Sequence, residues 1–169
     1  MALRGKSLPK PSLATVSNRL TGMLRYTRFQ LAVKAAVAVG IAWSIAPLVP
    51  GVASQYPYYA PLGALVSMYP TVAGSARAGV QTLIGLVIGI GLALIALLFG
   101  GPTVWTIALI VGLGVLLAGI PRLGAGRDYL PMAALFVLVL GGDDADGYSY
   151  GYAVQMCVGV LVGLTVNAV

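Results

Sequence analysis

The sequence predicts an all-α membrane protein with six transmembrane helices, built as two inverted three-helix repeats, with both termini in the cytoplasm and with short second and fifth helices. The first observation is composition: of the 169 residues, 59% are hydrophobic and 8% are charged, whereas soluble domains carry about 25% charged residues. The second is a succession of apolar runs, several of them close to the roughly 20 residues of a membrane-spanning helix. The third is an internal repeat.

Two short apolar stretches, each broken by a proline, form the centre of the repeat. They are YYAPLGALVSMY at 58–69 and YLPMAALFVLVL at 129–140. Matching positions hold the same residues, in the pairs Tyr59 with Tyr129 and Pro61 with Pro131. Paired short segments at corresponding positions of two halves indicate a substrate path in membrane transporters.

The residues that follow each short stretch repeat as well. VQTLIGLVIG at 80–89 returns as VQMCVGVLVG at 154–163, at a shift of 74 positions instead of the 70 that relates the short stretches. Because each half contains an odd number of spans, the second copy crosses the membrane in the opposite direction, and the repeat is inverted. We expect 29–99 and 104–169 to be the two repeats of one transmembrane domain.

Residues 1–28 are expected to form a basic cytoplasmic segment ahead of the transmembrane domain at 29–169. A signal peptide has a shorter basic region and a cleavage site of small residues, so the first apolar run is interpreted as a retained span. Apolar residues at helical spacing predict an amphipathic helix over 12–26 on the inner membrane face, and a disordered basic tail is the alternative. The basic residues are Arg4, Lys6, Lys10, Arg19, Arg25 and Arg28.

The first repeat is expected to hold spans at 29–48, 58–69 and 78–99, with a turn at 74–77 before the third. Lys34 lies near the start of the first span, where a long side chain reaches the headgroups. The second span is too short to cross a bilayer unaided.

The second repeat is expected to hold spans at 104–120, 129–140 and 148–169. A basic turn precedes the short fifth span, and an acidic loop at 141–147 follows it. The chain stops directly after the sixth span without a polar segment, so we expect it to be a piece of a longer protein.

The distribution of basic residues predicts the orientation, because cytoplasmic loops are enriched in Lys and Arg. Beyond the N-terminal segment, the basic turns are those at Arg77 and at Arg122 and Arg127. The connections on the other side contain no Lys or Arg, namely 49–57, 99–103 and 141–147. The expected location is therefore the cell (inner) membrane, crossed several times, with the N-terminus cytoplasmic.

Arg77 is the first candidate for a substrate path. It lies beside Gly74, Ser75 and Gly79, whose small side chains leave room around the guanidinium. Arg binds carboxylates through two parallel hydrogen bonds, which suits an organic anion. The alternative is an ordinary positive charge that anchors the span at the inner membrane face.

Tyrosines and prolines of the short spans are the other path candidates. Tyr59, Tyr69 and Tyr129 can shape a path for an aromatic anion, with Pro61 and Pro131 freeing backbone polar groups nearby. Tyr is also common at membrane interfaces for its amphipathic character alone. A proline in the first helical turn frees no donor, so the sequence leaves open whether the short spans are kinked.

Small residues and amides at repeated positions predict the contacts between helices. Pairs of glycines four residues apart let two backbones approach closely in lipid, and buried amides hydrogen-bond between helices. The expected packing residues are Gly85, Gly89, Gly159, Gly163, Gln81 and Gln155.

Several classes of function are excluded by what the sequence lacks. With no His and a single Cys, no metal or redox cluster can be built, and neither a metal nor another cofactor is expected. There is no nucleotide-binding glycine loop and no Ser-His-Asp set, so we expect no catalytic residue and no enzyme activity. The net charge of +6 lies mostly before the first span, which indicates contact with membrane lipids and no nucleic acid.

The residues from Tyr56 to Ala93, with Arg77, Gly79 and Gly85 at their spacing, resemble the fusaric-acid-resistance-like (FUSC) and aromatic acid exporter superfamily. The resemblance extends through the order of the spans over 29–169. It implies an exporter of aromatic carboxylic acids in which Arg77 contacts the anion, although its repeat counterpart, Gly151, offers no second basic residue. Members usually carry a cytoplasmic helical domain after the six spans, which this sequence does not include.

The function expected from these observations is an inner-membrane transporter or channel-like facilitator that exports organic anions, with aromatic carboxylates as candidates, along a path between the two short helices. We expect a homodimer or larger assembly. The alternative is a non-transporting membrane subunit that docks on a larger membrane protein partner, an enzyme or a transporter.

Overall fold

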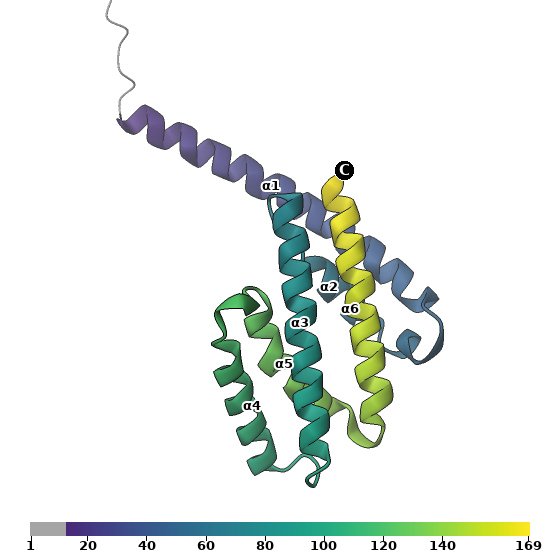
Figure 1. Cartoon of the computed structure of the whole chain (residues 1–169). Coiled ribbons are helices and arrows are strands. Elements are labelled where there is room, and N and C mark those ends of the chain that lie inside the picture. The colour runs from purple at the N-terminus through teal and green to yellow at the C-terminus, as the bar shows by residue number, and fades with distance from the viewer. Residues whose placement is uncertain (1–12) are drawn as a thin grey trace, which may run out of the picture.

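The computed structural model describes the backbone of residues 13–169 and the side chains of residues 27–169. This part of the chain is helical, and the prediction of six α-helices is confirmed (Figure 1). They are α1 Leu13–Ile45, α2 Tyr59–Val66, α3 Val72–Leu97, α4 Val104–Ala118, α5 Gly126–Leu140 and α6 Ala145–Ala168, with short 3-10 helices η1 Ala46–Leu48, η2 Gly51–Gln55, η3 Pro121–Leu123 and η4 Gly142–Asp144.

Three helical segments among the described residues are long and apolar enough to cross a membrane, namely Thr27–Leu48, Val72–Leu97 and Gly142–Ala168. The second and fifth helices are shorter, as predicted. At about 1.5 Å per residue, α2 is about 12 Å long and α5 about 22 Å, against a hydrocarbon core of about 30 Å. Neither can cross the bilayer alone, and α4, with 15 residues, is as short as α5.

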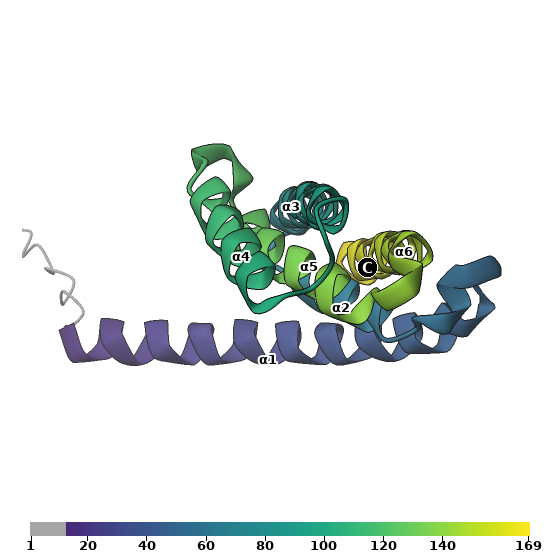
Figure 2. The same cartoon turned by 90° about the horizontal axis from the view of Figure 1, so that it is seen from below.

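The first helix is longer than predicted. The expected amphipathic helix at 12–26 and the expected first span form one continuous helix of 33 residues, α1. Figures 1 and 2 show α1 as a straight rod whose N-terminal half projects beyond the other helices. Residues 1–12 of the predicted cytoplasmic segment lie outside the described residues.

The predicted turn at 74–77 is wrong, because these residues belong to α3. Thr71 precedes the helix in an extended conformation, and its side-chain oxygen accepts a hydrogen bond from the Gly74 amide at 3.1 Å. This cap satisfies one of the amides that a helix start leaves free, and so the helix begins at Val72. Arg77 consequently lies in the second turn of α3 and not in a loop.

The two ends of the helix bundle differ in charge. Arg77 lies near the start of α3, and Arg122 and Arg127 lie between the end of α4 and the start of α5, where the chain packs beside Gln81 of α3. We call this side of the bundle, toward which α6 ends, the basic end. Residues 143–146, with three Asp, belong to the opposite, acidic end, where α6 begins. In Figure 1 α3 begins and α6 ends at the top, the connection between α4 and α5 lies lower, beside α3, and the acidic end is at the bottom.

The long helices pack against the short ones through glycines. In α3, a Cβ atom at Gly85 would collide with the carbonyl oxygen of Gly126 in α5. In α6, a Cβ atom at Gly159 would collide with the carbonyl oxygen of Ala60 in α2. The helix pairs α3 with α5 and α6 with α2 therefore approach to backbone contact, while α1 covers α2 and α4 covers α5.

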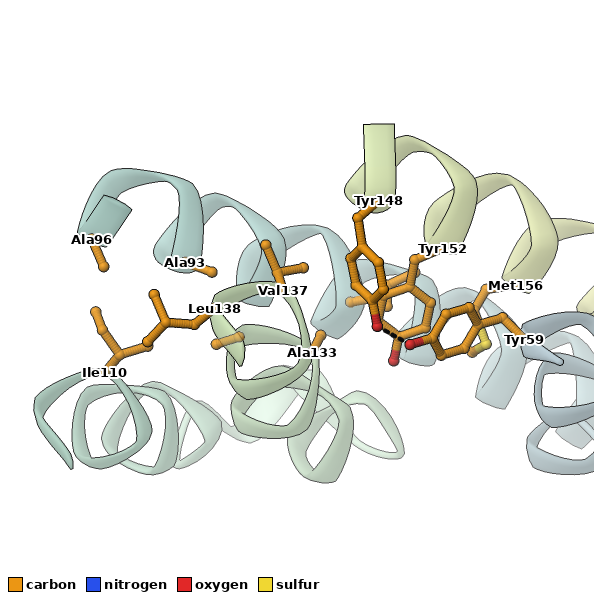
Figure 3. Packing of buried hydrophobic residues seen from close by; sticks show 12 residues of the cluster. Tyr59, Ala93, Ala96, Ile110, Ala133, Val137, Leu138, Tyr148, Tyr152 and Met156 are labelled. Carbon is orange, nitrogen blue, oxygen red and sulfur yellow. Dashed lines mark hydrogen bonds between the residues drawn. The ribbon is translucent and has the colours of Figure 1, made fainter. Parts of the chain in front are cut away.

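Two apolar clusters fill the bundle. One consists of small residues of α1 against α2, among them Ala38, Ala42 and Ala60. The larger one joins α2, α3, α4, α5 and α6 around Tyr59, Leu86, Val137 and Tyr152 (Figure 3). Large apolar side chains such as Val80 and Val87 on α3 remain exposed, as is expected for a bundle whose outer surface faces lipid.

Candidate functional site

The short helices α2 and α5 approach each other near the centre of the bundle. The ring of Tyr59, at the start of α2, lies 6.5 Å from the ring of Phe136 in α5, measured between centroids. Each short helix has its closest backbone contact with a long helix of the other half, so α2 and α5 meet mainly through side chains.

Tyr59 belongs to a buried tyrosine cluster, which we define as Tyr59, Tyr148 and Tyr152. The Tyr59 and Tyr148 hydroxyls are hydrogen-bonded to each other, and the rings of Tyr59 and Tyr152 lie 3.9 Å apart at an angle of 32°. All three side chains are at most 2% exposed. Figure 3 shows Tyr148 and Tyr152 extending from α6 toward Tyr59. The cluster closes the space between α2, α5 and α6.

Sequence reasoning found Tyr59 but missed Tyr148 and Tyr152. The two missed residues are four positions apart at the start of α6, a spacing that puts both on one helix face. The spacing indicates that the two tyrosines share a helix face, but it does not indicate whether that face is turned to lipid or to the interior.

A second feature of the site is a cavity of about 370 Å³, which we call the α2–α5 cavity. It lies toward the basic end, where α2 ends and α5 begins. Its lining comes from both halves of the chain and consists of Leu65, Val66, Met68, Tyr69, Thr82, Ala125, Asp128 and Tyr129. Two predicted path residues, Tyr69 and Tyr129, are therefore brought to one cavity, while Tyr59 lies in the tyrosine cluster instead.

The wall of the α2–α5 cavity holds one buried hydroxyl that sequence reasoning missed. Thr82 of α3 is 1% exposed, and its Oγ1 has no hydrogen-bond partner among the described residues. No sequence signal distinguishes this threonine, because its position depends on how α3 is rotated against α5. Asp128, at the start of α5, is exposed and is the charged residue of the lining.

Arg77 is exposed on α3 and is not part of the cavity lining. It precedes Gln81 by four residues, so both side chains lie on one face of the helix. The Gln81 side-chain oxygen accepts a hydrogen bond from the Ala125 amide at 3.2 Å, and Ala125 lines the cavity. The face of α3 that carries Arg77 is thus the one beside the cavity rim.

The two prolines occupy different places in their helices. Pro61 is the third residue of α2, within the first turn, where a missing N–H costs no hydrogen bond. Pro131 lies inside α5, so the carbonyl of Arg127, four residues earlier, loses its usual helical donor. Only the fifth helix therefore has a backbone acceptor freed by proline.

The two predicted amides both link separate segments, in different ways. Gln155 of α6 is fully buried and donates to the carbonyls of Ala46 at 2.9 Å and Ala53 at 2.8 Å. Gln81 is half-buried and accepts the single bond from Ala125. The packing glycines are placed likewise, Gly85 and Gly89 against α5 and Gly159 and Gly163 against α2.

Comparison with known proteins identifies a family that matches most of the chain. The family described as "Aromatic acid exporter family member 1" matches residues 28–169. Neither the curated proteins nor the solved structures contain a match. The family match covers most of the chain and confirms the resemblance seen in its sequence. The chain therefore belongs to the aromatic acid exporter family, a family of membrane transport proteins.

Proposed function

We propose that the protein exports aromatic carboxylate anions across the inner membrane, along a path between α2 and α5. The observation that carries this proposal is the α2–α5 cavity, because both short helices contribute to its wall through Tyr129 and through the residues at the end of α2. Clefts of this size with few polar groups are typical of small-molecule sites.

The proposed architecture is a pair of inverted repeats, supported by reciprocal packing. Gly85 and Gly159 occupy matching positions of the two repeats. Each lies in the third helix of its own half and contacts the short helix of the other half. Such an exchange is expected when two copies are related by a two-fold axis in the membrane plane.

The proposed orientation places the basic end in the cytoplasm. The arginines of this end outnumber its one acidic residue, Asp128, whereas residues 143–146 at the other end are acidic among the described residues. Positive charge marks the cytoplasmic side of a membrane protein. The same charge attracts anions toward the mouth of the α2–α5 cavity.

In the proposed mechanism, Arg77 attracts the substrate carboxylate at the cavity rim, and Tyr69 and Tyr129 shape the entrance. The tyrosine cluster closes the path farther toward the acidic end, so its rings must move apart for passage. An anion that leaves a negative interior gains about 2.3 kcal/mol per charge per 100 mV. The membrane potential alone therefore drives export.

The test is a flux assay with radiolabelled benzoate in proteoliposomes under an imposed potential. We expect potential-dependent flux with the unmodified protein and at least a tenfold lower flux with Arg77→Ala, because the charge at the rim is lost. Arg28→Ala is the matched control, since Arg28 is an exposed arginine of α1. Gel filtration must show that the assembly, which we propose to be a homodimer or larger, is unchanged.

Equal flux in Arg77→Ala and the unmodified protein would remove Arg77 from the path. The competing function, an accessory subunit that transports nothing, predicts that benzoate and other aromatic carboxylates do not move at all. It also predicts stoichiometric co-purification with a larger membrane enzyme or transporter.

A further inference from the structure

Positions that the repeat relates to each other are packed differently in the two halves of the bundle. By the repeat shifts of 70 and 74 positions, residues that line the α2–α5 cavity correspond to residues of the other half. Among the pairs are Val66 with Phe136, Thr82 with Met156 and Tyr129 with Tyr59. At the location that the repeat relates to the cavity, the space is filled, because Met156 and Tyr59 are both buried there and Tyr59 packs beside Phe136.

Aromatic rings fill the space at that location. Tyr148 and Tyr152 of α6 occupy the space beside Tyr59, and their counterparts in α3, by the shift of 74 positions, are Gly74 and Ala78. At these two positions one half therefore has tyrosine rings and the other half has small side chains. The α2–α5 cavity, with a volume of about 370 Å³, lies within the range of small-molecule sites, about 300–1,000 Å³.

One polar side chain of the cavity wall is buried, whereas Tyr69 and Asp128 of the same lining are exposed. The Thr82 hydroxyl is buried in the wall without a partner among the described residues, and such a group costs free energy until it is paired. Its neighbours Leu65, Val66 and Met68 are apolar. A buried hydroxyl among apolar side chains pairs readily with an uncharged polar group, but it does not offset the burial of a carboxylate.

We infer that the α2–α5 cavity binds the aromatic ring of the transported acid and that Thr82 hydrogen-bonds an uncharged polar substituent of that ring. The carboxylate of the ligand stays at the rim, away from Asp128 and toward the arginines. This inference rests on the proposed export function for the identity of the ligand, but binding to the cavity can be measured without transport.

The first experiment measures the contribution of Thr82 by calorimetry on the purified full chain. The probes are 3- and 4-aminobenzoate, each compared with the methylbenzoate of the same shape. The unmodified protein should bind at least one amino compound five times more tightly than its methyl counterpart. Thr82→Val, which keeps the volume, should remove this preference, and Thr82→Ser, which keeps the hydroxyl, should retain it.

The second experiment fills the cavity with the residues of the other half. Val66→Phe and Thr82→Met should each weaken the binding of all four probes at least tenfold. Val80→Phe, on the exposed face of α3, adds the same ring elsewhere and should bind as the unmodified protein does. Thermal unfolding identifies a variant that fails to fold. Probe binding by the other filling variant then decides whether the cavity is the ring site.

The two proposals fail in different ways. If Thr82→Val keeps the amino preference, or if a folded filling variant binds normally, the cavity is not the ring site, whatever the flux assay gives. If the unmodified protein binds these probes through Thr82 but benzoate does not cross proteoliposome membranes, the ring site stands and the export function is wrong.

Discussion

Single residues join separate segments of this bundle through side chains that hydrogen-bond to backbone groups. Gln155 holds η1 and η2 to α6 by donating to two carbonyls, whereas Gln81, at the matching position of the other half, makes one bond to the turn before α5. That turn contains Gly124, whose φ of +48° and contact with Gln81 exclude a larger residue. The same amide in two copies therefore contributes unequally to stability.

We expect Gln155→Leu to lower the free energy of unfolding by about 1–3 kcal/mol, since interhelical hydrogen bonds in membranes contribute about 0.6 kcal/mol on average and up to about 1.7. Gln81→Leu should cost about 0.6 kcal/mol, because it removes one bond. Unfolding by denaturing detergent, followed by circular dichroism, measures both. A larger loss in Gln81→Leu than in Gln155→Leu would contradict this assignment.

The candidate site was partly predictable at this scale. Tyr69 and Tyr129 were found because they end or begin the short stretches, and both line the cavity. Thr82, Tyr148 and Tyr152 were not found, because they are ordinary residues of long apolar helices. Their importance depends on which helix face is turned inward, and in a bundle exposed to lipid both faces are apolar.

At the scale of elements, the order and number of helices follow from the apolar runs, and the short second and fifth helices follow from their prolines and length. The helix starts were less predictable. α3 and α6 begin earlier than expected because the side chains of Thr71 and Asp144 accept hydrogen bonds from the amides three residues on. The glycines of α3 then determine how closely α5 approaches.

A pair of alanine substitutions within α3 tests the glycine contacts. Gly85→Ala should destabilise the protein by about 1–3 kcal/mol, because the added methyl meets the backbone of Gly126 and must force α3 and α5 apart. Gly91→Ala, with open space around its Cβ position, should be neutral or stabilising by up to about 1 kcal/mol. Thermal unfolding in a mild detergent compares them.

At the scale of the whole molecule, the charge difference between the two ends is the basis of the proposed orientation. Cys157 is the single cysteine of the sequence, so a background with Cys157→Ala allows one new thiol at a time. Asp143 at the acidic end and Ile120 at the basic end are both exposed.

An impermeant maleimide added to intact cells should label Asp143→Cys and leave Ile120→Cys unlabelled, because the acidic end faces outward in the proposed orientation. Opening the cells should expose Ile120→Cys to the same reagent. The reverse pattern in intact cells would mean that the protein is inserted the other way round.

The unbroken first helix has a mechanical consequence. At about 1.5 Å per residue, α1 extends for about 50 Å, far more than the hydrocarbon thickness of about 30 Å. Its far portion is packed by alanines against α2 and α6, while residues 13–26 extend away from the bundle. Because α1 packs against α2 through Ala38 and Ala42, a force on the projecting residues would also tilt α2. Tyr59 of α2 would then shift against the rings of Tyr148 and Tyr152.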